Sequence, residues 1–276
     1  MPELPEVEVI LNQLRVHIGG STIHEFHIRR SDIIQTGLST HHWYRGSRIT
    51  DITRKGKSLI FTCTKNQDIR YMVAELGMTG LFLFHSASAG YHKHIHLTFT
   101  FPSSHESTLH YWNPRRFGRV YLFDAEHVHQ FTQRRFGVDP LSLSQENFYD
   151  RIHRTRGRLK AFLLNQHNLA GIGNIYANEI LYDARIHPHT QGCRLSKAAI
   201  ARLYDSMHTI LRKAIRSGGS SIRDFRAPDG TRGQYQKQHV IYQKTGRPCV
   251  RGCPTTIRRL VTERRSFYCP MCQKRR

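Results

Sequence analysis

The sequence predicts an α+β protein with several domains, and three observations carry this prediction. One amphipathic helix near the N-terminus precedes a series of short strand-like segments, a middle region has helical periodicity, and four of the six cysteines lie in residues 249–276. Together they indicate an N-terminal β-sandwich or barrel with the helix packed on it, a helical domain, and a small C-terminal module that its cysteines hold together.

The N-terminal part begins with a helix and continues in strands. Between Pro5 and Ile18 apolar residues recur at helical spacing, and Gly19-Gly20 end the helix. The strands that follow are short and rich in β-branched or aromatic residues: Ser58 to Thr64, Ile69 to Leu76, Leu81 to His85, Ile95 to Phe101, Thr108 to Trp112 and Val120 to Phe123.

The character of the chain changes near Asp139-Pro140, where we expect a linker. Two short helices, Arg158 to Gln166 and Ile175 to Ala184, precede a long one that Ser196 caps and Gly218-Gly219 stop. The Gly- and charge-rich stretch after it has the composition of a mobile loop. The domains expected are 1–137, 138–235 and 236–276.

The charge of the chain indicates a polyanionic partner. Its 276 residues hold 42 Lys and Arg against 20 Asp and Glu, a formal net charge of +22. Nucleic acid is the simplest partner for such an excess, although an RNA-binding or ribosome-bound protein would have the same balance. No apolar run approaches the roughly 18 residues of a membrane span, and no secretory signal opens the chain. We expect a cytoplasmic, nucleoid-associated monomer.

The cysteines near the C-terminus have the spacing of a metal site. The pairs Cys249-x3-Cys253 and Cys269-x2-Cys272 predict one zinc ion held by four thiolates, which is structural because no position is left open for water. Unligated thiols or two disulfides are the alternative. Thr255 to Tyr268 has the pattern of a β-hairpin. The module carries eight basic residues against one acid, Glu263, which favours a phosphate-binding finger over a merely solvated charge run.

The first residues of the chain could form a nucleophilic site. If Met1 is removed, Pro2 carries a free secondary amine beside the carboxyl group of Glu3, a pair suited to attack an electrophilic sugar carbon. The alternative is an ordinary helix N-terminus, because proline and carboxylates are both favoured there.

Three loops have compositions that suit contacts with nucleic acid. The turn at 171–174 (Gly-Ile-Gly-Asn) opens a helix, where free backbone N–H groups suit a phosphate. The loops at 113–118 (Asn-Pro-Arg-Arg-Phe-Gly) and 77–80 (Gly-Met-Thr-Gly) carry Phe117 and Met78. Such side chains fill the gap that an extruded base leaves, although each could equally be a core residue.

Taken in order, these motifs resemble the formamidopyrimidine-DNA glycosylase family across essentially the whole chain. The motifs are MPELPEVE at the start, Lys57, GMTG, NPRRFG, GIGNIYANE, GGSSIRDF and the terminal cysteine pairs. The resemblance implies that the helical part is a helix–two-turn–helix domain. It also implies a bifunctional glycosylase and AP lyase of base excision repair, which removes 8-oxoguanine and formamidopyrimidines from double-stranded DNA.

The resemblance also implies roles for individual residues. Pro2 is the Schiff-base nucleophile, Glu3 the general acid at the deoxyribose ring oxygen, Lys57 an aid to β-elimination and Arg264 the finger residue tied to δ-elimination. Ser217 to Asp224 is the loop that closes over the damaged base. The remaining DNA contacts are Met78, Arg115 and Phe117, which fill the hole in the duplex, and His94, Lys160 and Asn174, which bind phosphates.

Four departures from the family pattern stand out. The first cysteine pair has one extra residue, Asn113 replaces the usual Asp, Glu75 replaces a common His, and Thr155 stands between Arg154 and Arg156 where lysine is frequent. Two other functions compete with this interpretation. One is an endonuclease VIII-like glycosylase for oxidised pyrimidines, although Leu4 stands where that branch usually has Gly. The other is an inactive zinc-finger DNA-binding protein, which predicts losses at Pro2, Glu3 or Lys57 that the chain does not show.

Overall fold

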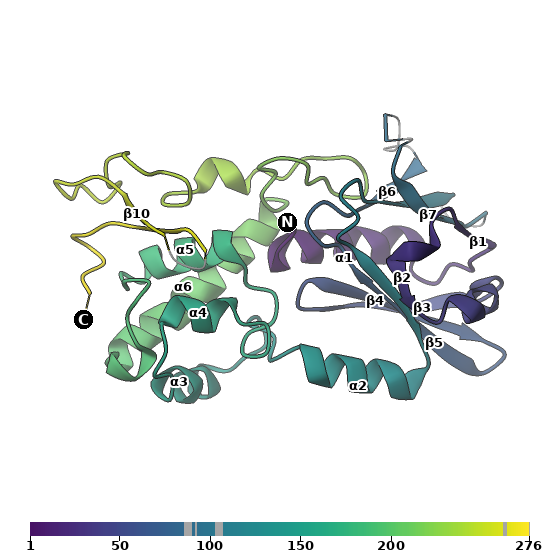
Figure 1. Cartoon of the computed structure of the whole chain (residues 1–276), viewed down its shortest axis with the longest axis horizontal. Coiled ribbons are helices and arrows are strands. Elements are labelled where there is room, and N and C mark those ends of the chain that lie inside the picture. The colour runs from purple at the N-terminus through teal and green to yellow at the C-terminus, as the bar shows by residue number, and fades with distance from the viewer. Residues whose placement is uncertain (86–89, 92, 103–106, 262–263, 276) are drawn as a thin grey trace. The chain divides into compact units, whose positions relative to one another are not determined.

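The computed structural model describes residues 1–85, 90, 91, 93–102, 107–261 and 264–275 (Figure 1). They form two compact units. The first consists of residues 1–135 and 215–236, and the second of residues 136–214 and 237–276. The chain therefore returns to its first unit for about twenty residues after its longest helix. The three-domain division at 137/138 and 235/236 stays a prediction.

The first unit is built on helix α1 (Leu4–Ile18) and two β-sheets. One face of α1 is fully buried, with Val7, Ile10 and Leu14 at 0% exposure. These residues share one core with Phe61 and Ala74 of one sheet and with aromatic residues of the other, so the helix completes the core between the sheets.

The two sheets confirm a sandwich rather than a barrel. The four-stranded sheet has the order β1 (Glu25–Ile28), β7 (Ile95–Thr100), β8 (Thr108–Trp112), β6 (Leu81–Phe84). The five-stranded sheet has the order β2 (Ile34–Thr36), β9 (Arg119–Phe123), β5 (Asp68–Glu75), β4 (Ser58–Lys65), β3 (Arg48–Lys55). Neighbouring strands are antiparallel except β2 and β9, which are parallel.

The six predicted strands are present, each within about one residue of its expected ends. The structure adds β1, β2, β3 and helix α2 (Ala125–Arg135), which the sequence analysis did not predict. Their composition explains this. β3 reads RITDITRK, and α2 buries only Val128 fully, so neither has the dense apolar pattern that marks a strand or helix. Short 3-10 turns lie at Ser31–Ile33, Leu38–Tyr44, Gly192–Arg194 and Tyr235–Gln238.

The second unit contains the three predicted helices, α4 (Leu159–Leu164), α5 (Asn174–Asp183) and α6 (Lys197–Arg216), whose last two residues belong to the first unit. It adds α3 (Gln145–His153), for which the sequence analysis named no separate helix. Ser196 caps α6, because its Oγ accepts a hydrogen bond from Ala199 N at 3.3 Å. Gly218 and Gly219 follow α6 with φ of +71° and +78°, a conformation that favours glycine and ends the helix.

The finger is a short antiparallel hairpin of β10 (Arg258–Leu260) and β11 (Ser266–Tyr268). Glu263 and Arg276, which entered the charge count above, lie outside the described residues. α5 holds the segment that leads into the finger through Glu179, a carboxylate only 1% exposed. Its oxygens accept the N–H groups of Val240, Ile241 and Tyr242 at 3.0, 3.1 and 2.8 Å. Among the described residues, no helix has the length and apolar character needed to cross a membrane.

Glu179→Gln should destabilise the second unit, because the amide sets an N–H donor against a backbone N–H in a buried site. We expect a loss of about 2–4 kcal/mol, the scale of one or two buried groups left unsatisfied. Urea unfolding measures it, and Glu146→Gln on the exposed face of α3 is the matched control. Equal unfolding midpoints for the two variants would contradict this role of Glu179.

Candidate active site and nucleic-acid interface

The N-terminal amine lies in a buried, charged corner of the first unit. Pro2 is buried and Glu3 is 3% exposed. Burial is the main reason that the pKa of the terminal amine, here that of Met1, lies below its ordinary value. The charges that act on it follow: Glu3 and Glu6 raise its pKa, Lys57 lowers it and Asp224 raises it. Charged residues from the start of α1, from the β3–β4 turn and from the loop after α6 thus act on the pKa of one amine.

Glu6 joins the start of α1 to the loop after α6. Its side chain is 1% exposed, and its Oε2 accepts the N–H of Glu3 at 2.8 Å. Its Oε1 accepts the N–H of Ser220 at 2.7 Å. Gly219 lies so close that an added Cβ would sit 3.0 Å from Glu6 Cγ and Oε1. A single carboxylate therefore fixes both the N-cap next to Pro2 and the first residues of the loop.

The loop itself has a buried base and an exposed tip. Ser221 Oγ donates to Phe225 O at 2.7 Å and accepts from Gly233 N at 2.8 Å, while Phe225 enters the core of the first unit. Gly219 O accepts from Tyr235 N at 3.0 Å, which closes the base. Ile222, Arg223 and Asp224 are exposed at the tip. In the expected lesion loop, 217–224, residues 219–221 are therefore anchored, while the last three residues are open to solvent.

Met78 and Phe117 lie on two adjacent loops and are not core residues. Their exposures are 41% and 54%, and the Arg115 guanidinium lies 5.1 Å over the Phe117 ring. Gly77 has φ of +61°, and an added Cβ there would come within 2.5 Å of the Phe117 carbonyl, so the loops touch through their backbones. Two exposed apolar tips beside a guanidinium form a surface suited to enter a base stack.

Asn113 ties these loops together in a way that an aspartate would not. Its Nδ2 donates to Tyr111 Oη at 3.3 Å, and its Oδ1 accepts from Thr79 Oγ1 at 3.4 Å. Because the Tyr111 hydroxyl already donates to Glu75 O at 3.1 Å, it needs a donor, which a carboxylate cannot provide. His94 lies at the start of β7, exposed, and its carbonyl accepts from Asn113 N at 3.0 Å. The Glu75 carboxylate pairs with Arg135 at 3.3 Å.

In the second unit Lys160, Asn174 and Arg264 gather at the finger. Lys160 is 5% exposed, and its Nζ donates to Arg265 O and Ser266 Oγ, both at 2.8 Å. Asn174 Nδ2 donates to the same Arg265 O at 3.2 Å. Lys160 and Arg264 also line a cavity of about 420 Å³ with Arg158 and His189. Three cationic side chains, those of Arg158, Lys160 and Arg264, line one cavity, which suits a phosphate.

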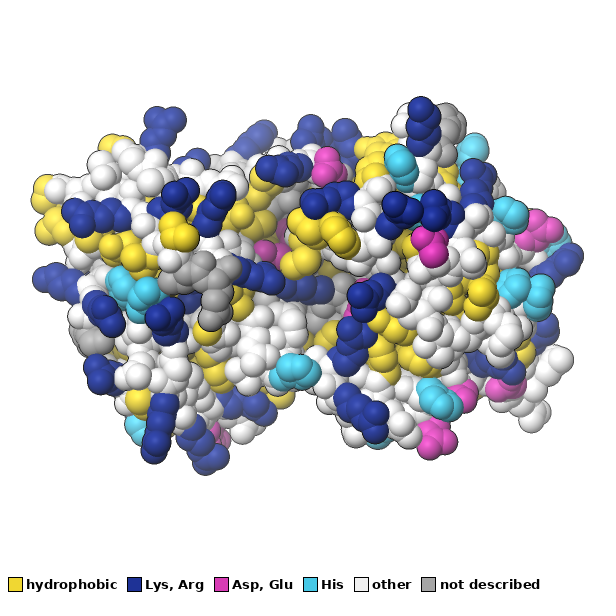
Figure 2. Space-filling model, viewed as in Figure 1, with side chains coloured by type: hydrophobic (Ala, Val, Ile, Leu, Met, Phe, Trp, Pro, Cys, Tyr) yellow, Lys and Arg dark blue, Asp and Glu magenta, His cyan; other side chains and the backbone are white. Residues whose placement is uncertain are grey.

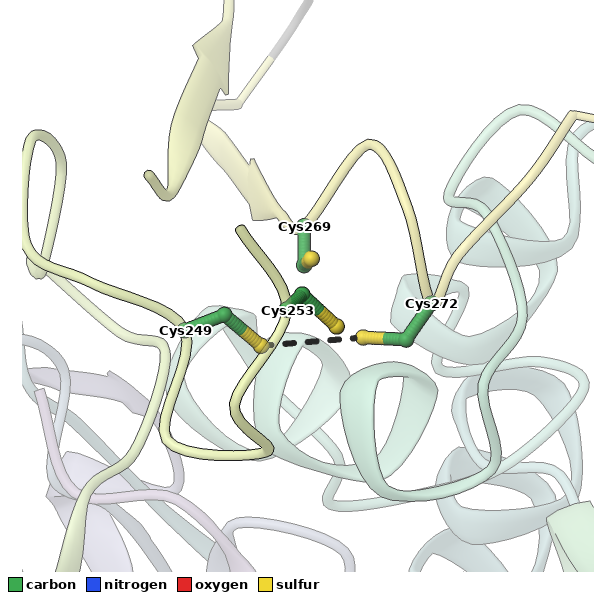
Figure 3. A group of neighbouring side chains, drawn as sticks. All are labelled: Cys249, Cys253, Cys269 and Cys272. Carbon is green, nitrogen blue, oxygen red and sulfur yellow. Dashed lines mark hydrogen bonds between the residues drawn. The ribbon is translucent and has the colours of Figure 1, made fainter. Parts of the chain in front are cut away.

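The four cysteines of the finger converge (Figure 3). Their sulfur atoms all lie within 4.8 Å of one another, and those of Cys249 and Cys272 are 3.9 Å apart. A tetrahedral site with Zn–S bonds of ~2.3 Å has sulfur–sulfur edges of about 3.8 Å, so the donor set fits a metal ion. All six cysteines of the chain are free of disulfides. On the face of the molecule in Figure 2, Lys and Arg side chains are widespread and acidic side chains are far fewer.

Comparison with known proteins agrees with this geometry. The family model described as the formamidopyrimidine-DNA glycosylase N-terminal domain matches residues 1–120, and the one for the H2TH domain of the same enzymes matches residues 136–226. Curated formamidopyrimidine-DNA glycosylases from Exiguobacterium and Solibacter usitatus are 35% and 37% identical, each over 100% of both chains.

The chain belongs to the formamidopyrimidine-DNA glycosylase family. Solved structures of the family have the same fold. The Lactococcus lactis enzyme in complex with DNA containing an abasic site superposes with a TM-score of 0.88 at 33% identity, covering 99% of this chain and 100% of that one. The Thermus thermophilus MutM structure gives 0.85 at 32% identity and covers 100% of both chains.

Within this glycosylase fold, each unit brings together a different part of the predicted site. The first unit gathers Pro2, Glu3 and Lys57 around the amine, and separately joins Met78, Arg115 and Phe117 on touching loops with His94 nearby. The second unit gathers Lys160, Asn174 and Arg264 and, apart from them, the four cysteines. The role of each residue stays a prediction.

Three residues that sequence reasoning missed stand out. Glu6 lies in the recognised N-terminal motif, but its partner Ser220 is 214 positions away. Arg158 belongs to the basic run before Lys160, which was a usable signal. His189 carried no signal, and burial together with nearby Arg158 lowers its pKa.

Glu6→Gln should loosen the loop without unfolding the unit. The amide can accept only one of the two backbone N–H groups well, so the Ser220 amide loses protection against hydrogen exchange by about tenfold, equivalent to ~1.4 kcal/mol. Hydrogen–deuterium exchange measures this directly. Glu8, on the same helix as Glu6, is paired with Arg54 of β3; Glu8→Gln breaks that ion pair, is the control, and should leave the exchange of Ser220 unchanged. Equal Ser220 exchange in wild type and Glu6→Gln would rule out the proposed anchor.

Proposed function

We propose that this chain is a bifunctional DNA glycosylase and AP lyase that removes oxidised purines, chiefly 8-oxoguanine opposite cytosine and formamidopyrimidines, from double-stranded DNA. The observation that carries the proposal is a terminal amine in a buried corner with Glu3, Lys57 and the loop residue Asp224 around it. Family members bound to DNA with an abasic site and with a Fapy-dG lesion support the same substrate class.

The nucleophile is the amine of Pro2 once Met1 has been removed. A terminal amine has an ordinary pKa of ~8, against ~10.4 for lysine, so a larger share is neutral near pH 7. Burial lowers the pKa of the Met1 amine in this corner, and we expect the same environment to favour the reactive neutral form of the Pro2 amine. The nitrogen bonds to C1′ of the damaged nucleotide as the bond from C1′ to the base breaks, and the base leaves with the proton that the amine gives up. Glu3, as general acid, donates its proton to the ring oxygen as the sugar opens.

Strand cleavage follows from the same covalent intermediate. A secondary amine bound to C1′ forms an iminium ion, which withdraws electrons and makes the C2′ proton acidic. Loss of that proton expels the 3′ phosphate, a step that Lys57 assists, and a second elimination near Arg264 expels the 5′ phosphate. Excision and backbone cleavage are thereby coupled in one site.

The remaining residues hold the DNA. Met78, Arg115 and Phe117 occupy the space of the everted base, with Arg115 facing the orphaned cytosine, while His94, Lys160 and Asn174 bind backbone phosphates.

One Zn²⁺ held by Cys249, Cys253, Cys269 and Cys272 keeps the finger folded, and its four thiolates leave no position for catalysis. A monomer located in the cytoplasm with the nucleoid stays part of the proposal.

Borohydride should trap the processed chain on DNA that contains an abasic site or 8-oxoguanine. Reduction of the iminium makes the bond permanent, and peptide sequencing should place the cross-link on residue 2. Pro2→Gly is the matched control, because it keeps an amine and should retain some trapping. A chain with a retained N-terminal extension should give none. Equal trapping with and without the extension, or a cross-link on another side chain, contradicts the mechanism.

Single-turnover kinetics should separate this function from its pyrimidine-directed alternative. We expect 8-oxoguanine opposite cytosine to be excised at least about tenfold faster than thymine glycol, a difference of ~1.4 kcal/mol in activation free energy. The comparison uses duplexes that differ only at the lesion, and an abasic duplex controls for lyase activity. Faster release of thymine glycol would instead assign the chain to the oxidised-pyrimidine branch.

A further inference from the structure

Arg251, which lies between the first two cysteines of the finger, contacts the end of α5. Gly252, with φ of +73°, turns the chain so that Arg251 reaches the end of the helix. Arg251 Nη1 donates to Tyr182 O at 2.7 Å, and Nη2 donates to Asp183 O at 2.9 Å. The last carbonyls of a helix have no intrahelical partner, and the negative end of the helix favours a cation there. Arg251 therefore caps α5 from within the cysteine segment 249–253.

The same arginine covers the ring of Tyr182, whose hydroxyl reaches a metal ligand. The guanidinium lies 4.5 Å from the ring centroid, and Tyr182 is 2% exposed. Tyr182 Oη is 3.2 Å from Cys249 Sγ. A metal-bound cysteine is a thiolate and can only accept, so the hydroxyl is the donor.

α5 also grips the rest of the finger. Asn178 Oδ1 accepts from Phe267 N at 2.8 Å in the hairpin, and Glu179 accepts three N–H groups before the first cysteine. These contacts hold the hairpin of the finger and the segment that leads into it, but none of them reaches a cysteine sulfur atom. Tyr182 supplies a hydrogen bond from α5 to a cysteine sulfur of the metal site.

We propose that Tyr182 is a positioning residue for the metal centre: its hydroxyl, held in place by Arg251, donates to the Cys249 thiolate, fixes segment 249–253 on α5 and slows loss of the metal. Hydrogen bonds to metal ligands orient them and stabilise their charge. This inference concerns retention of the metal and does not depend on which lesion the protein excises.

The test is the rate of zinc transfer from the full-length, zinc-loaded protein to an excess of a chromophoric chelator. Tyr182→Phe keeps the ring and removes the donor, and we expect zinc release about tenfold faster, the lower end of the effect of losing a partner of a metal ligand. The cobalt-substituted variant should also show a shifted sulfur-to-cobalt charge-transfer band, because the thiolate loses a hydrogen bond.

Tyr204→Phe is the matched control. It removes a tyrosine hydroxyl that donates to Leu143 O at 2.9 Å in the same unit, with no contact to a cysteine, and should leave both readouts unchanged. Arg251→Met keeps the hydroxyl but removes the clamp, and should give faster release with a smaller spectral shift. The proposal is overturned if Tyr182→Phe matches wild type in both readouts. It is overturned equally if Tyr204→Phe accelerates release as much, since the effect would then be general destabilisation.

Discussion

The candidate active site depends on one buried carboxylate that two distant segments share. Glu6 accepts one backbone N–H beside Pro2 and another at the start of the loop after α6, so neither segment can move without breaking a buried hydrogen bond. Burying a carboxylate without hydrogen-bond partners costs free energy. Loss of either contact would therefore leave Glu6 less well satisfied in its buried site. The glycine at 219 is part of the same constraint, because a side chain there would collide with Glu6. The amine and the loop that would cover a damaged base are thus set in place by a single group.

The second unit uses the same physical device. Glu179 accepts three backbone N–H groups of residues 240–242, and Lys160 donates to backbone and hydroxyl oxygens at 265 and 266. A hairpin with strands of three residues cannot be stable alone. Its conformation comes from side chains of α4 and α5 together with the cysteine cluster. Lys160 therefore holds the finger through two hydrogen bonds and also brings a positive charge to the cavity that Arg264 lines.

Local patterns predicted most of the fold, and the resemblance predicted the residues of the site. α1, α6 and six strands follow from periodicity, the cap at Ser196 and the glycines at 218 and 219. β3 and α2 were not predicted because each has few buried residues among many polar ones, so its apolar periodicity is weak. The Glu6–Ser220 and Tyr182–Cys249 contacts escaped for another reason. They join residues 214 and 67 positions apart, and no local pattern in a single sequence encodes such a pairing. Asn113 entered as an unexplained departure, and only the Tyr111 hydroxyl shows why an amide suits that position.

The exposed side chains of Met78 and Phe117 have a consequence for the protein in solution. Two exposed apolar side chains on one surface favour self-association of the protein. A net charge of +22 opposes this, because like-charged molecules repel over roughly the Debye length of ~8 Å at physiological ionic strength. The cationic surface would then act as a colloidal stabiliser in addition to attracting a polyanion. Concentrated salt removes that protection, so Met78 and Phe117 would become the first points of self-association.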